Sequence, residues 1–188
     1  RLFELTRGMS STSLEQLLRA ALALRGPESS PLPFRRVEGP DSPRAIVVLG
    51  LRPAAGPWSE PQAAEAVAWV EPGIRVKPRP GQFIARVAGS SMAPAIPDGA
   101  WCLFERPWPQ PRHGEVGIFS RHDSGEPDGV ARFTLKEFRP ELAETDEGVA
   151  LTNSLRSRNR NFRALRASPG AEPRDRPFAR FVRVLAVE

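Results

Sequence analysis

The chain has 188 residues, 40% of them hydrophobic, so it is long enough to form one compact domain together with a short additional segment. Its 21 prolines and 15 glycines exclude long uninterrupted helices, because both residues interrupt helical structure. The formal net charge of +5 is compatible with a nucleic-acid partner but does not by itself indicate one. A turn-rich, mainly β protein is therefore expected.

The cysteine content and hydropathy pattern bear on the compartment. The single cysteine, Cys102, excludes an internal disulfide framework, and its apolar surroundings in WCLF are typical of a core position. No window approaches the roughly 18–20 apolar residues that cross a bilayer, and no secretory signal is recognisable. We expect a cytoplasmic protein without a membrane partner, and because residue 1 is arginine, a fragment or a processed product.

The first predicted element is a short helix at residues 14–25. Ser13 and Gln16 form a capping box, an apolar face of leucine and alanine follows, and Gly26 with the next proline ends the helix. The helix lacks the second helix that a helix-turn-helix motif requires. Residues 26–44 are rich in proline, serine and glycine, which is typical of a linker.

Short apolar runs follow one another from residue 45, each bounded by glycine, proline, aspartate or asparagine. The runs are AIVVLGL, EAVAWVEP, QFIARVAG, GAWCLFER, EVGIFSRH, ARFTLKEF, GVALT and ARFVRVLAV. They predict a compact, twisted β-fold, barrel-like or layered. The chain is accordingly divided into residues 1–44, an N-terminal helix and linker that would be the remnant of a larger protein, and residues 45–188, a β domain.

The stretch GSSMAPAIPDG, residues 89–99, carries the first candidate for chemistry. Gly89 permits a sharp turn at a strand end, which presents Ser90 and Ser91 together with consecutive backbone N–H groups that could stabilise an oxyanion. A Ser-Ser turn alone is most often structural. A nucleophilic serine also needs a group that takes its proton.

Two residue types could supply that base. His113 and His122 lie in the loop-like segments PRHGE and SRHDSGE, where a surface position is the ordinary interpretation, and two histidines without a cysteine partner make a poor metal site. The chain has 25 arginines and only two lysines. Lys136 lies in the strand-like run ARFTLKEF, where burial would lower its pKa, whereas Lys77 lies in a proline-flanked loop and is expected at the surface. No metal or cofactor is expected.

Five arginines recur within eleven residues near the end of the chain. They are Arg156, Arg158, Arg160, Arg163 and Arg166. Either a solvated edge or a set of phosphate contacts explains this pattern.

The turn GSSMAPAIPDG, with TLKEF placing a lysine 45 residues after Ser91, resembles the Ser-Lys peptidase domain of LexA-type repressors and their self-cleaving relatives, a superfamily that includes signal peptidases. The resemblance implies the fold of that domain, with Ser91 as nucleophile and Lys136 as general base. It places Ser90 and Met92 in the turn and oxyanion region. Pro94, Asp98 and Gly99 fill further structural positions of the motif.

Two further segments extend the resemblance over residues 45–188. RPAAGPWSE is similar to the Ala-Gly cleavage loop of the self-cleaving members, which implies a scissile bond between Ala55 and Gly56, 35 residues before Ser91. LRSRNRNF, residues 155–162, resembles a late segment of the family with the order Leu, Ser, Asn and an aromatic residue.

The chain departs from the family pattern at several positions. Ala100 and Glu137 replace residues that are often aspartate and a basic residue, and residues 123–129 make a connection longer than usual. Glu137 is expected to point to the strand face opposite Lys136. No winged helix-turn-helix domain is recognisable before residue 45, which leaves a repressor role open.

The resemblance implies a serine autoprotease that cuts itself once as a regulatory switch, in a stress-linked or DNA-damage-linked transcriptional or defence response. Its substrate would be its own cleavage loop. A homodimer formed through the C-terminal strands, an activator protein, and DNA contact only through a domain not evident here are expected. Two alternatives stay open: a dimerisation or regulatory module that no longer cleaves, and a peptidase acting on another protein, as signal peptidases do.

Overall fold

The computed structural model describes residues 32–56, 58–73, 75–122, 130–145, 148–166 and 175–187. Every regular element in these residues is a β-strand. The helix predicted at residues 14–25 lies outside them. Among the described residues no helix is long and apolar enough to span a membrane. The prediction of a mainly β fold is therefore confirmed.

The described residues form eleven strands, most of them at the predicted apolar runs. They are β1 (Arg35–Val37), β2 (Ile46–Leu49), β3 (Gln62–Ala63), β4 (Ala66–Glu71), β5 (Gln82–Arg86), β6 (Trp101–Glu105), β7 (Val116–Arg121), β8 (Val130–Thr145), β9 (Gly148–Arg156), β10 (Leu165–Arg166) and β11 (Asp175–Ala186).

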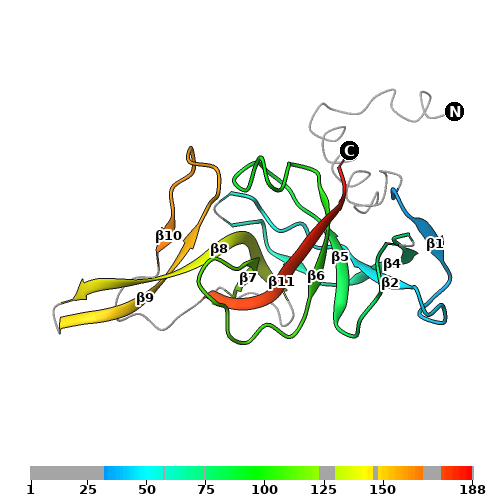
Figure 1. Cartoon of the computed structure of the whole chain (residues 1–188), viewed down its shortest axis with the longest axis horizontal. Helices are drawn as coiled ribbons and strands as arrows, with labels where there is room; N and C mark the ends of the chain where they lie inside the picture. The colour runs from blue at the N-terminus through cyan, green and yellow to red at the C-terminus, as the bar shows by residue number, and fades with distance from the viewer. Residues whose placement is uncertain are drawn as a thin grey trace, which may run out of the picture. The chain divides into compact units, whose positions relative to one another are not determined.

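The strands hydrogen-bond into one strongly twisted sheet (Figure 1). Its order is β1-β4-β2-β5-β6-β11-β7-β8-β9-β10, and β3 pairs with β8 outside this path. Pairing is antiparallel except between β2 and β5, which run parallel. The last long strand, β11, inserts between β6 and β7, with shifts of register against both. The two parts of the sheet are thus joined by a strand that lies far away in the sequence.

The sheet surrounds an apolar core because its central strands are hydrophobic on both faces. Three of the five residues of β5 and four of the five residues of β6 are buried. Phe83 of β5 stacks on Phe104 of β6 with ring centroids 5.5 Å apart. The central cluster also includes Met92 and Ala55, two residues of connecting loops. Both loops therefore pack into the interior of the domain.

Strand β8 continues past the body of the sheet and forms a two-stranded ribbon with β9 that extends from one end of the domain (Figure 1). Its pairing with β7 covers Arg132 to Glu137, and the following residues pair with β9 alone. Pro140 lies in this outer half, where a proline is tolerated because one side of the strand has no further partner in the sheet.

The compact unit of the described chain extends over Phe34–Glu188, so the sheet begins before the predicted domain start at residue 45. Strand β1, in the segment interpreted as linker, pairs with β4. The three residues of β1, Arg-Arg-Val, show no alternation of apolar and polar side chains. They adopt a strand conformation because they hydrogen-bond to the edge of β4. The two-residue strands β3 and β10 escaped prediction for the same reason.

Gly117 of β7, which lies opposite Lys136 of β8, offers a test of how closely β7 packs against Trp108 and β11. A Cβ atom at Gly117 would lie 2.2 Å from Cζ3 of Trp108 and 2.5 Å from the carbonyl oxygen of Ala179. Gly117→Ala should lower the free energy of unfolding by about 1–3 kcal/mol, the usual cost of overpacking, as measured by urea denaturation. Gly39→Ala, where the nearest atom is 4.0 Å away, is the matched control. Equal stabilities of the two variants would contradict the packing described.

Candidate active site

The turn after β5 is held in a single conformation by backbone geometry and one carboxylate. Gly89 has φ +96°, a left-handed conformation that favours glycine. Its N–H donates to Oδ1 of Asp98 at 2.6 Å, which ties the start of the turn to its end. Ser91 follows and is fully buried, and Met92 is packed in the central core. The serine hydroxyl is therefore presented inside the domain.

Lys136 reaches this hydroxyl from β8. Its Nζ atom donates to Oγ of Ser91 at 3.1 Å and to the carbonyl oxygen of Leu135 at 3.0 Å. The side chain is 1% exposed, and burial lowers the pKa of Lys136 from its ordinary 10.5 to about 8. Among the described residues no carboxylate forms an ion pair with it. A substantial fraction of the amine is thus neutral near pH 8.

The predicted cleavage loop lies between the Ser90–Ser91 turn and strand β8. Ala54 forms parallel bridges with Ala88 on one side and Thr134 on the other, so the segment is inserted between the end of β5 and strand β8. The N–H of Ala55 donates to the Ala88 carbonyl at 2.5 Å, and the N–H of Leu135 donates to the Ala54 carbonyl at 3.0 Å. The residues before the predicted scissile bond are therefore bound as an additional strand.

The carbonyl of Ala55 faces the nucleophile turn. The backbone N–H of Ser91 donates to the Ala55 carbonyl oxygen at 2.9 Å, the contact expected of an oxyanion-stabilising donor. A Cβ atom on Gly89 would lie 2.9 Å from the same oxygen, so a side chain there would push the segment away. The amide that makes this contact belongs to Ser91 itself. The roles assigned to Ser90 and Met92 in oxyanion binding stay predictions.

Thr134 fixes the two peptide groups around the predicted scissile bond. Its Oγ1 is 3.0 Å from the carbonyl oxygen of Ala54 and 3.3 Å from that of Gly56, so its single proton is donated to one of these oxygens or shared between them. Thr134 and Lys136 are two residues apart on β8 and therefore point to the same face of the strand. Sequence reasoning missed Thr134, although its place two residues before the lysine was a usable signal.

Asn159 was also missed as a functional residue, although the segment LRSRNRNF that contains it was singled out. Its backbone N–H donates to the Ser91 carbonyl at 2.8 Å, and its Nδ2 donates to the Ser90 carbonyl at 3.0 Å. These two bonds hold the outer side of the Ser90–Ser91 turn. The late segment is thus part of the site because it positions the nucleophile.

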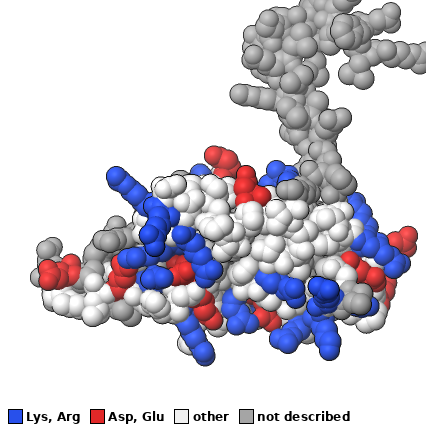
Figure 2. Space-filling model, turned by 45° about the horizontal axis from the view of Figure 1, so that its top comes forward, with Lys and Arg blue, Asp and Glu red and all other residues white. Residues whose placement is uncertain are grey.

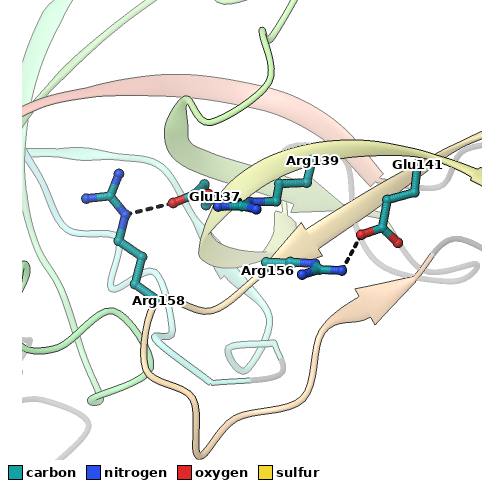
Figure 3. A network of polar contacts seen from close by, with 5 residues as sticks. All are labelled: Glu137, Arg139, Glu141, Arg156 and Arg158. Atoms are coloured by element: carbon teal, nitrogen blue, oxygen red, sulfur yellow. Dashed lines mark hydrogen bonds and ion pairs between the residues drawn. The ribbon is translucent and has the colours of Figure 1, made fainter.

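Glu137 directly follows Lys136 on β8, so strand alternation places it on the opposite face of the strand. There it anchors the late segment (Figure 3). Its carboxylate accepts from Nε of Arg139 at 2.6 Å and from Nε of Arg158 at 2.8 Å. Burial by itself would raise the pKa of Glu137, but these hydrogen bonds and charges hold it below its ordinary value. Arg158 immediately precedes Asn159. The ion pair between Arg158 and Glu137 therefore fixes the segment whose Asn159 hydrogen-bonds to the Ser90–Ser91 turn.

A second ion pair, between Arg156 and Glu141, lies beside this network (Figure 3). Two of the five clustered arginines are therefore neutralised by carboxylates of β8. On the face drawn in Figure 2, basic side chains lie next to acidic ones over the same part of the domain. This arrangement favours the solvated-edge interpretation of these two arginines over phosphate contact.

The other candidates lie away from this chemistry. Lys77, His113 and His122 are exposed, as predicted. Cys102 is fully buried, and burial raises the pKa of its thiol to about 12, in keeping with a core role. The described residues contain no group of histidine, cysteine, aspartate and glutamate side chains that could hold a metal ion.

The buried amine makes the stability of the domain depend on pH. Between about pH 8, where folded Lys136 titrates, and pH 10.5, where it titrates when unfolded, the unfolded state binds more protons, so the free energy of unfolding rises with pH. In a Ser91→Ala, Cys102→Ala background, which removes the opposing contribution of a buried thiol whose pKa is 9.0 when unfolded and about 12 when folded, the rise should approach about 1.4 kcal/mol per pH unit by urea denaturation. Lys136→Met should abolish it and Lys77→Met should not. Equal pH slopes in the Lys136→Met protein and its parent would show that the amine is not desolvated.

Two comparisons with known proteins bear on the family of this chain. No curated protein matches the sequence. The family model described as Peptidase S24-like matches residues 47–169, a range that contains Ala55, Ser91, Lys136 and Asn159. The match covers more than half of the 188 residues. The chain therefore belongs to the Peptidase S24-like family, as the resemblance in its sequence indicated.

Proposed function

We propose that this protein is a serine autoprotease that cuts its own chain between Ala55 and Gly56. The observation that carries the proposal is the position of one carbonyl group. The Ala55 carbonyl oxygen accepts from the Ser91 N–H at 2.9 Å, while the Lys136 amine lies 3.1 Å from the Ser91 hydroxyl. Nucleophile, base and substrate carbonyl meet in one buried cleft.

The first step is acylation. Neutral Lys136 takes the proton of the Ser91 hydroxyl as Oγ bonds to the carbonyl carbon of Ala55. The carbonyl oxygen becomes negatively charged and is stabilised by the Ser91 N–H. When the carbonyl re-forms, the bond to the Gly56 nitrogen breaks, and protonated Lys136 gives its proton to the leaving amine. The product is an ester between Ala55 and Ser91, with a new N-terminus at Gly56.

The second step is hydrolysis of that ester. Lys136, neutral again, takes a proton from a water molecule that attacks the ester carbonyl. The ester bond breaks, Oγ of Ser91 recovers a proton, and Ala55 ends in a carboxylate. The carbonyl oxygen of Leu135, which accepts a hydrogen bond from Nζ of Lys136, keeps the amine oriented through both steps.

Intramolecular attachment makes a slow dyad sufficient, because the substrate never has to diffuse to the site. Each chain can be cut once, which suits a regulatory switch. We extend the proposal to a stress-linked or DNA-damage-linked transcriptional or defence role, with an activator protein that favours the docked loop and a homodimer as the assembly.

Cleavage should accelerate as Lys136 loses its proton. With a pKa of about 8, the neutral fraction of the amine rises about tenfold between about pH 7 and pH 9 and then levels off. The rate of self-cleavage of the purified chain should follow this curve. Mass spectrometry should find two fragments whose masses correspond to a cut between Ala55 and Gly56.

Variants separate the dyad from the fold. Ser91→Ala and Lys136→Ala should stop cleavage, and Lys77→Ala, which changes an exposed lysine, should not. A serine-directed phosphonate should label Ser91 in the parent chain and fail to label the Lys136→Ala variant. A folded parent chain that neither cuts nor labels at alkaline pH would refute the proposal and favour the regulatory module that does not cleave.

A further inference from the structure

The part of the cleavage segment that follows the scissile bond is bound as firmly as the part that precedes it. The N–H of Ser59 donates to the Phe133 carbonyl at 3.1 Å, and the Phe133 N–H donates to Oγ of Ser59 at 2.9 Å. Nε2 of Gln62 donates to the same Oγ at 2.8 Å. These contacts fix the path of the chain directly after Trp58.

Trp58 lies against a second apolar cluster, separate from the central core. The buried members of that cluster are Trp108, Phe119, Phe138 and Leu155. The guanidinium of Arg121 covers the Trp58 ring, with its carbon 4.4 Å from the ring centroid. A cation in this position is attracted to the indole face.

Arg121 is itself held in place. Its Nε and Nη2 atoms donate to the two carboxylate oxygens of Asp175 at 2.7 and 3.1 Å. Arg121 ends β7 and Asp175 begins β11, so the pocket is built by strands that do not belong to the cleavage segment. Because Arg121 is already held by Asp175, its side chain loses little conformational freedom when the Trp58 ring binds.

The scissile residues themselves offer little surface for binding, because Ala54, Ala55 and Gly56 are small. Among the described residues of the loop, Trp58 has the largest apolar side chain, and aromatic rings dominate the energetics of such contacts. Its Nε1 is buried and has no hydrogen-bond partner among the described residues, which opposes binding. The ring rather than the N–H group therefore accounts for the attachment.

We propose that Trp58 is the positioning residue that docks the cleavage segment in the active cleft, and that Arg121, Asp175 and the apolar cluster form its recognition site. This inference rests on the proposed self-cleavage and names what holds the substrate in place. Substrate selection then depends on an aromatic residue three positions after Ala55, in addition to the small residues at the bond.

The first test measures cleavage and nucleophile reactivity in the same chain. Trp58→Ala should slow self-cleavage at about pH 9 by about tenfold or more, because the docked state is depopulated. Phosphonate labelling of Ser91 should stay equal or become faster, since the emptied cleft admits the reagent. Trp58→Phe keeps a ring and removes the unpaired N–H, and should restore cleavage to within about threefold of the parent. Trp69→Ala, in β4, is the control for loss of a tryptophan.

Arg121 gives a second variant that does not remove core volume. Arg121→Gln should slow cleavage about threefold to tenfold with unchanged labelling. Arg180→Gln removes a comparable arginine–carboxylate pair, with Glu105, and should leave the rate unchanged. Unchanged cleavage in both Trp58→Ala and Arg121→Gln would overturn the inference. Loss of labelling together with cleavage in both would overturn it as well, since these residues would then support the fold and not the docking.

A readout independent of catalysis separates this inference from the proposed function. In the Ser91→Ala background, elastase, which cuts after small residues, should attack the Ala54–Gly56 stretch at least about fivefold faster when Trp58 is replaced by alanine. If the parent chain shows no self-cleavage but this difference is found, the proposed function fails and Trp58 still docks the segment. Equal elastase rates would refute the docking role even in an active protease.

Discussion

The site depends on one physical constraint, the exclusion of water from the amine of Lys136. Its side chain is 1% exposed, and removal of an ammonium from water lowers its pKa to about 8. The same burial brings the amine within hydrogen-bond distance of Ser91. The cleavage segment contributes to that dry environment, because Ala55 belongs to the buried cluster that also contains Met92. The lowered pKa of Lys136 and the proposed docking of the substrate both depend on this packed interior.

Strand β8 connects the parts of the site because neighbouring residues along it contact different segments of the chain. Thr134 and Lys136 face the cleft, where they contact the cleavage segment and the nucleophile. Glu137 points to the other face of the strand and binds Arg158. The next residue, Asn159, hydrogen-bonds to the Ser90–Ser91 turn. A residue that departs from the family pattern thereby connects the base-bearing strand to the turn that carries the nucleophile.

Much of the fold was predictable because apolar runs bounded by turn residues are local signals. All eight predicted runs coincide with strands of the described sheet. The strands that escaped, such as β1 and β3, are short and polar, and they exist because a neighbouring edge offers hydrogen bonds. The insertion of β11 between β6 and β7 could not be predicted either, because pairing between distant segments leaves no periodic pattern in the sequence of either segment.

The sequence by itself determined the candidates: a serine at a glycine turn, a rare lysine in an apolar run, and a small Ala-Gly pair, in the order typical of the family. Only the tertiary structure decided that these residues meet, and that Thr134, Asn159 and Trp58 hold them. The reason is that hydrogen bonds and desolvation depend on distances in space. Ser91 and Lys136 are 45 residues apart in the chain, and a pKa shift arises only after folding has removed the water between them.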